Sequence, residues 1–78
     1  PSLNDRQSDI PSLVEFFLQT ICTEYGIAKK NMDKEAIALL QRHHWTGNIR
    51  ELRNIVERLV ILSDKQITEA DVHEHVKI

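Results

Sequence analysis

The sequence is poor in the residues on which disulfide-stabilised, membrane-spanning and sheet-rich proteins depend. Cys22 is the only cysteine, which excludes an intramolecular disulfide and fits a reducing compartment. No run of about 18 apolar residues occurs, so a transmembrane helix is excluded. Two glycines and two prolines leave few residues for the turns of a sheet protein, and an all-helical fold is favoured.

An excess of positive charge is also missing. Ten lysines and arginines against 12 acidic residues give a formal net charge of −2. Proteins that bind DNA or RNA usually carry more basic than acidic residues, so nucleic acid is disfavoured as the direct ligand. The histidines do not suggest a metal site, because His43 and His44 are adjacent and His73 and His75 would not share one face of a helix.

The length of 78 residues allows one small domain with a modest core. Residues 1–8 show no helical periodicity and are expected to form an extended connector, while residues 9–78 are expected to form a helical domain. Because no initiator methionine precedes Pro1, we expect the chain to be a piece of a longer protein.

Hydrophobic periodicity and capping residues predict three main helices and a short C-terminal helix. These are expected between Asp9 and Gly26, over residues 34–42, over residues 49–62, and after Thr68. Asp33 is predicted to cap the second helix, and Thr68 is predicted to form a capping box with Asp71. Residues 27–32 are predicted to form a loop and residues 63–66 a turn.

One apolar stripe on each helix is predicted to form the core. The predicted stripe of the first helix comprises Ile10, Leu13, Val14, Phe17, Ile21 and Tyr25, widened by Phe16 and Leu18. That of the third helix comprises Ile49, Leu52, Ile55, Val56, Leu59 and Val60. Cys22 lies beside the first stripe and is expected to be a small buried hydrophobe. Val72 and Val76 are expected to anchor the last helix.

Several charged residues are expected to lie at the surface. Lys29 and Lys30 are predicted to be solvated in their loop. Glu57 and Arg58 are predicted to form surface ion pairs of little energetic value, and the same is expected of Arg53, which could also face a neighbouring subunit.

The strongest local signal is the stretch at residues 45–54, which reads Trp-Thr-Gly-Asn-Ile-Arg-Glu-Leu-Arg-Asn. Asn48 and Glu51 have the spacing of a capping box at the start of the third helix. Arg50 falls in the first turn, where a cation gains nothing from the helix dipole. An arginine beside the unpaired N–H groups of a helix start is suited to a phosphate. Arg50 is therefore a candidate phosphate ligand.

This stretch is similar to the sensor-2 motif of the sigma-54-dependent transcription activators, the NtrC-like response regulators, which are AAA+ ATPases. The similarity extends along nearly the whole chain. Leu3-Asn4-Asp5-Arg6 and Asp9-Ile10-Pro11 resemble the segment that leaves the ATPase core. Ile61-Leu62-Ser63 and the segment at residues 67–72 resemble the end of the same domain. The resemblance implies an all-α, four-helix, bundle-like AAA+ lid.

The resemblance also implies a nucleotide site that this chain shares with a separate core domain. Arg50 would reach the β- and γ-phosphates of ATP as the sensor-2 arginine. Arg6 would lie at the junction of core and lid, Ile10 would lie near the adenine, and Asn48 completes the predicted set. The core would hold ATP and its Mg²⁺, so no cofactor is expected on this chain alone.

The chain is not expected to be an enzyme by itself, because it contains neither a Gly-x-x-x-x-Gly-Lys phosphate loop nor an acidic residue placed for magnesium. The resemblance implies instead that it contributes to ATP binding and hydrolysis and couples nucleotide state to transcription activation in the cytoplasm. The implied partners are the AAA+ core of the same chain, neighbouring subunits in a ring, sigma-54 RNA polymerase, and DNA through a separate C-terminal helix-turn-helix domain. No membrane partner is implied.

Two other functions stay open at this point. The chain could contain a DNA-binding helix-turn-helix, formed by the predicted helices 34–42 and 49–62 and the glycine-containing segment between them. Arg50, Arg53 and Arg58 could then face a groove of DNA. The chain could also be a helical protein-interaction module without a nucleotide role.

Overall fold

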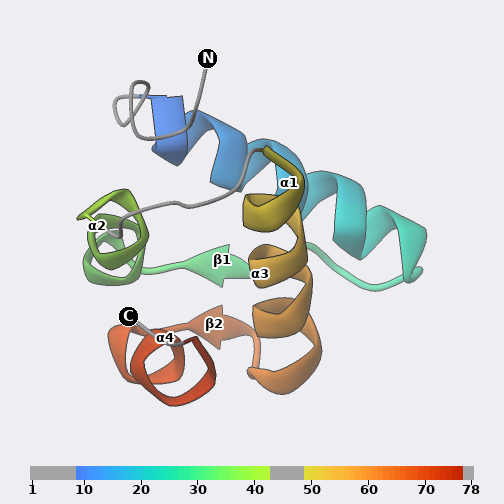
Figure 1. Cartoon of the computed structure of the whole chain (residues 1–78). Helices are drawn as coiled ribbons and strands as arrows, with labels where there is room; N and C mark the ends of the chain where they lie inside the picture. Colours follow the sequence, from blue (N-terminus) through green and yellow to red (C-terminus); the bar gives the residue numbers. More distant parts are fainter. Residues whose placement is uncertain (1–8, 43–48, 77–78) are drawn as a thin grey trace.

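The computed structural model describes residues 9–42 and 49–76, and these residues form four helices and one pair of short strands (Figure 1). In chain order the elements are α1 (Ile10–Glu24), β1 (Asn31–Met32), α2 (Lys34–Arg42), α3 (Ile49–Leu62), β2 (Gln66–Ile67) and α4 (Glu69–His75). The all-α prediction is confirmed, and the helices lie where periodicity and capping residues predicted them. The connector expected at residues 1–8 lies outside the described residues.

The two strands were not predicted. They pair in parallel, with Asn31 opposite Gln66 and Met32 opposite Ile67. The amide of Asp33 also donates to the carbonyl of Ile67 at 2.9 Å, and the side-chain amide of Gln66 donates to the carboxylate of Asp33. Two residues are too few to show the alternation that identifies a strand. The pair joins the segments that lead into α2 and α4, and these two helices pack side by side (Figure 1).

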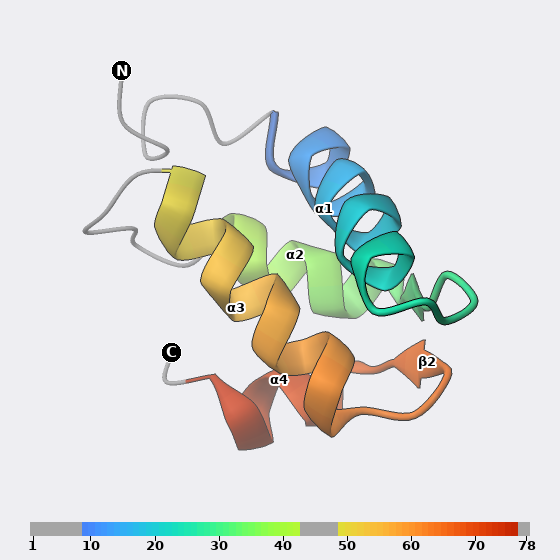
Figure 2. The same ribbon diagram turned by 90° about the vertical axis from the view of Figure 1, so that its right-hand side faces the viewer.

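The core forms where α1 packs against α3 and where α2 and α4 close the other side (Figure 2). Its fully buried side chains come from all four helices and from β2, and the largest are Ile10, Leu18, Ile21, Leu40, Leu52, Leu59 and Ile67. Cys22, Val72 and Val76 are buried as predicted.

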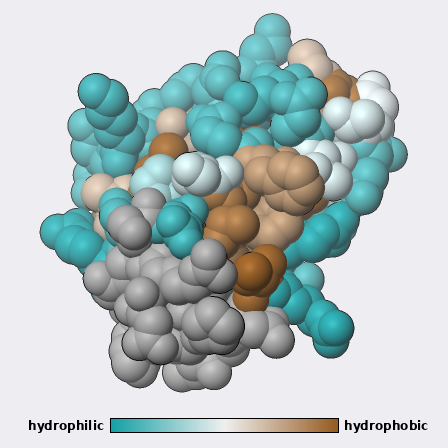
Figure 3. Space-filling view, turned by 90° about the horizontal axis from the view of Figure 1, so that it is seen from above, coloured by the Kyte–Doolittle hydropathy of each residue, from teal (hydrophilic) through white to brown (hydrophobic). Residues whose placement is uncertain are grey.

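Three residues of the predicted stripes are exposed instead. Phe16 is 60% exposed, Tyr25 45% and Ile49 44%. Phe16 lies one position before the buried Phe17, about 100° around the helix, and its ring contacts Phe17 edge-on with centroids 5.6 Å apart. Tyr25 and Ile49 lie at helix ends, Tyr25 just after the last residue of α1 and Ile49 at the first residue of α3. Seen from above, an apolar area lies within the mostly polar surface (Figure 3).

The predicted caps are confirmed at two helix ends. Gly26 ends α1 with a φ of 68°, and the amides of Gly26 and Ile27 bond back to the carbonyls of Thr23 and Cys22. Thr68 and Asp71 form both hydrogen bonds of a capping box at α4. At α1, Asp9 occupies the N-cap position but its side chain makes no cap hydrogen bond. The capping box predicted for α3 involves Asn48, which lies outside the described residues.

The prediction that Lys30 is merely solvated is wrong. Its ammonium group donates to the carbonyls of Val60 and Ser63, at 2.6 Å each, at the C-terminal end of α3. A cation stabilises this end of a helix because unpaired carbonyls and the negative end of the dipole meet there. Lys29 lies in the same loop, is exposed, and forms an ion pair with Glu15 at 2.6 Å. The local sequence does not distinguish these two neighbouring lysines. The fold does, because it brings Lys30 to the end of α3 and leaves Lys29 at the surface.

Ser63, just after α3, is buried, and its hydroxyl has no hydrogen-bond partner within the described part of the chain. A buried polar group without a partner costs about 1–3 kcal/mol. We therefore expect Ser63→Ala to leave the free energy of unfolding unchanged or to raise it by about 1 kcal/mol, measured by urea unfolding. A loss of stability would show that the hydroxyl has a partner in solution.

Candidate functional site

Arg50 is exposed in the first turn of α3. The start of α3 and the start of α1 lie at the same end of the molecule, the upper end in both ribbon views (Figures 1 and 2). The first backbone N–H groups of a helix have no partner within that helix and carry a partial positive charge. The guanidinium of Arg50 and these groups together favour an anion at this end of the fold.

The other members of the predicted nucleotide-binding set are placed differently. Ile10, the first residue of α1, is fully buried, so its side chain belongs to the core. Arg6 and Asn48 lie outside the described residues. Arg50 is therefore the one member of the set, among the described residues, that has an exposed side chain.

Arg53 joins α1 to α3 and is the centre of a small charged cluster, which we call the α1–α3 clasp. Its guanidinium lies 2.8 Å from the Glu24 carboxylate at the end of α1 and 3.5 Å from Glu57 one turn further along α3. The Tyr25 hydroxyl donates to the other Glu57 oxygen at 2.5 Å. The ion pairing predicted for Arg53 is confirmed, and Glu57 pairs with Arg53 and not with its neighbour Arg58.

The clasp changes the acidity of Tyr25. The hydrogen bond to Glu57 is the largest cause, and with desolvation and the negative charge of Glu57 it raises the pKa of the Tyr25 phenol above its usual value of about 10. A raised pKa means that the folded state holds the proton more tightly than the unfolded state. The contribution to stability is therefore present below the unfolded pKa and is lost as the pH rises through the folded pKa.

This shift is measurable because Tyr25 is the only tyrosine. We expect the ultraviolet absorbance of phenolate to appear at a higher pH in the folded chain than in the urea-unfolded chain. Replacing the acceptor, in Glu57→Gln, should bring the folded-state pKa back toward the usual value. Equal midpoints in the folded parent and in the variant would show that the Tyr25–Glu57 hydrogen bond does not form in solution.

One group of side chains has a spacing that could suit a metal ion, and the sequence did not indicate it. Asp71, Glu74 and His75 place ligand atoms within 4.8 Å of one another. The carboxylate of Asp71 already accepts from the backbone and hydroxyl of Thr68 in the capping box. Exposed acidic groups often gather in this way without an ion.

None of the helices in the described ranges is long and apolar enough to cross a bilayer.

The arrangement is that of a small helical lid, with an arginine exposed in the first turn of its third helix. The profile of the AAA+ ATPase lid domain family matches residues 4–77, and the chain belongs to this family. Within this family, the chain is similar to parts of the regulators NtrX and NtrC, as the sequence resemblance implied.

Three similarities illustrate the match. The chain is 48% identical over 63 residues to the nitrogen assimilation regulatory protein NtrX of Azorhizobium caulinodans, covering 81% of the chain and 14% of NtrX. It is 41% identical over 75 residues to the DNA-binding transcriptional regulator NtrC of Rhizobium meliloti, covering 96% of the chain and 15% of NtrC. The crystal structure of NtrX from Brucella abortus in complex with ATP superimposes with a TM-score of 0.83 at 46% identity, covering 91% of the chain and 17% of that protein.

Proposed function

We propose that the chain acts as a lid over ATP bound by a separate AAA+ core, and that Arg50 is the sensor-2 arginine that contacts the β- and γ-phosphates. The observation that carries this proposal is the exposure of Arg50 in the first turn of α3, in a chain of the AAA+ lid family. The chain spans only about one-seventh of the NtrX and NtrC relatives. We propose that the phosphate loop and the magnesium ligands lie in a core domain outside it.

The chemistry of the guanidinium suits this role. It stays charged at every physiological pH and donates two parallel hydrogen bonds to phosphate oxygens. Negative charge that develops on the transferred phosphoryl group is stabilised by a cation that is already in position. When the γ-phosphate leaves, a charge-assisted contact is lost, and the lid–core equilibrium shifts by the free energy of that contact. Arg6 and Asn48 are proposed to contribute to the nucleotide site as well.

The consequences of lid movement belong to the full-length protein. We propose that rotation of the lid is transmitted through a ring of subunits to sigma-54 RNA polymerase in the cytoplasm, and that a separate helix-turn-helix domain binds DNA. The crystal structures of Brucella abortus NtrX with ATP and with ADP support the nucleotide part of this proposal, since they show that a related protein binds both.

The helix-turn-helix alternative is less well supported. It requires the arginines of α3 to face DNA phosphates together. Arg53, however, is engaged by Glu24 and Glu57, and the net charge of the chain is negative. Arg53 and Arg58, five residues apart, also lie about 140° from each other around the helix. One groove cannot receive both side chains.

The direct test is the ATPase activity of the full-length protein with Arg50 replaced by alanine. The lid proposal expects reduced hydrolysis, because the contact forms with the phosphates. Unchanged hydrolysis would favour the remaining alternative, a helical interaction module without a nucleotide role.

A further inference from the structure

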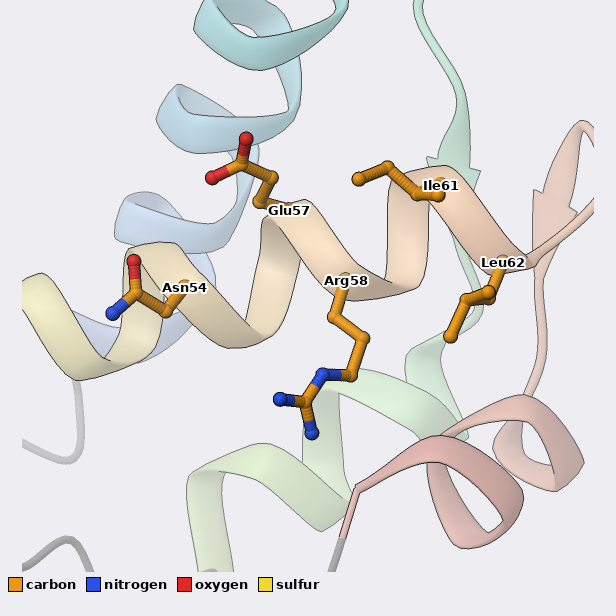
Figure 4. Close-up of a pocket in the computed structure, with 5 residues that line it drawn as sticks. All are labelled: Asn54, Glu57, Arg58, Ile61 and Leu62. Carbon is orange, nitrogen blue, oxygen red and sulfur yellow. The ribbon is translucent and has the colours of Figure 1, made fainter.

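The solvent-facing side of α3 carries a shallow recess, which we call the Arg58 groove. It has a volume of about 300 Å³ and is lined by Asn54, Glu57, Arg58, Ile61 and Leu62. Figure 4 shows that Glu57 and Ile61 extend to one side of α3, while Arg58 and Leu62 extend to the other. The groove lies at the opposite end of α3 from Ile49, away from the first turn.

The spacing of these residues is that of a helix-packing surface. Asn54, Arg58 and Leu62 form one row with a spacing of four residues, and Glu57 and Ile61 form the neighbouring row. Helices pack by placing a row of side chains from one helix into the groove between two such rows of the other. The geometry therefore suits a helix as the occupant of the groove.

The chemistry of the lining specifies the partner further. Ile61 is 57% exposed and Leu62 53%, so two adjacent aliphatic side chains face water at one end of the groove. Arg58, one turn earlier, is exposed and has no ion-pair partner within the described residues, whereas Glu57 is held by Arg53 and Tyr25. The groove thus offers a partner two exposed aliphatic side chains, Ile61 and Leu62, and one exposed cation, Arg58.

We propose that the Arg58 groove docks an amphipathic helix that carries aliphatic residues over Ile61 and Leu62 and a carboxylate over Arg58. Residues that face one side of a helix recur at three or four positions, so the carboxylate of the partner lies three or four residues from its aliphatic anchors. The proposal does not depend on the role of Arg50, which lies at the other end of α3.

A second copy of this chain fits the groove poorly. In an antiparallel pairing of two α3 helices, Ile61 opposite Leu62 of the other copy places Arg58 beyond the end of the other helix, because α3 ends at Leu62. Shifting the helices to bring Arg58 opposite Glu57 places Ile61 opposite the polar Asn54. Neither alignment satisfies the apolar pair and the cation together, so the partner has a different sequence.

DNA also fits the groove less well. An aliphatic pair beside Arg58 gains nothing from phosphates, and the carboxylate of Glu57 in the opposite row would repel them. A protein helix satisfies both features of the groove.

The test uses the ¹⁵N-labelled chain and a synthetic alanine-based helical peptide with the central pattern E-A-A-L-L-A-A-E. This pattern places a glutamate three residues from a leucine in either orientation of the helix. We expect NMR resonances of residues 54–62 to shift on titration. Arg58→Glu should weaken binding about tenfold or more, because a like charge then faces the peptide glutamates. Exchanging both peptide glutamates for lysine should restore binding to the Arg58→Glu chain.

The matched control is Arg42→Glu, which makes the same charge change at an exposed arginine on α2. This variant should bind the peptide like the parent chain. The proposal is overturned if millimolar peptide leaves α3 unshifted, or if the two charge reversals weaken binding equally. Self-association of the chain through the same residues, or tighter binding of a DNA duplex than of the peptide at this face, would also overturn it.

Discussion

Replacing Arg50 by alanine should lower the ATPase rate of the full-length protein by roughly 10- to 150-fold. This range corresponds to the loss of one charge-assisted contact worth about 1.5–3 kcal/mol in the transition state. Arg50→Lys should give an intermediate rate, because lysine keeps the charge but cannot donate two parallel hydrogen bonds. The measurement is steady-state phosphate release at saturating ATP, so that weaker ATP binding is separated from slower chemistry.

Arg42→Ala is the matched control for the effect of Arg50→Ala on the ATPase rate. Arg42→Ala removes the same side chain from an exposed position in the last turn of α2 and should hydrolyse ATP at the parent rate. The folded state of each variant is checked by circular dichroism of the lid, because Arg50 is exposed and its replacement should not unfold the domain. If Arg50→Ala and Arg42→Ala hydrolysed ATP equally well, the sensor-2 assignment would be abandoned.

Replacing Lys30 by methionine should lower the free energy of unfolding by about 2–3 kcal/mol. Methionine keeps most of the length and apolar surface of the stem, so the change removes chiefly the ammonium group. That group donates to two carbonyls at the end of α3, and hydrogen bonds from charged donors contribute about 1.5–3 kcal/mol. Urea unfolding followed by circular dichroism measures the loss, which is large for a domain of 78 residues.

The neighbouring lysine supplies the control. Lys29→Met breaks one exposed ion pair with Glu15 and should cost less than about 1 kcal/mol, a cost that salt screens. The two variants have the same composition and differ by one position in the same loop. Equal losses of stability would mean that the position of Lys30 at the end of α3 contributes nothing, contrary to the structure.

The helices and most of their ends could be predicted because the signals lie within a few residues of one another. The 3.6-residue periodicity of apolar side chains identified α2 and α3, Gly26 marked the end of α1, and Thr68 with Asp71 marked the start of α4. The same local reasoning selected Arg50, since the helix dipole does not favour a cation in the first turn and helix stability therefore does not explain this residue. The family resemblance then implied that the ligand of Arg50 is the triphosphate of ATP.

Several contacts that local reasoning missed join residues about 30 positions apart. Lys30 bonds to the end of α3 across 30 and 33 positions, Tyr25 reaches Glu57 across 32, and Arg53 reaches Glu24 across 29. The parallel strand pair belongs to the same class. No periodicity within one segment carries such information, because it depends on how two helices and two loops meet.

The amino-acid sequence by itself determined the helical class, the ends of the helices, the family and the candidate arginine, since each rests on side chains that act within one turn or one motif. Only the tertiary structure decided which charged residues are structural and which face outward. It placed Lys30 and Arg53 in contacts between elements and left Arg58, Ile61 and Leu62 together at the surface. The physical reason is that a charge finds its partner through space, and neighbours in space are set by packing.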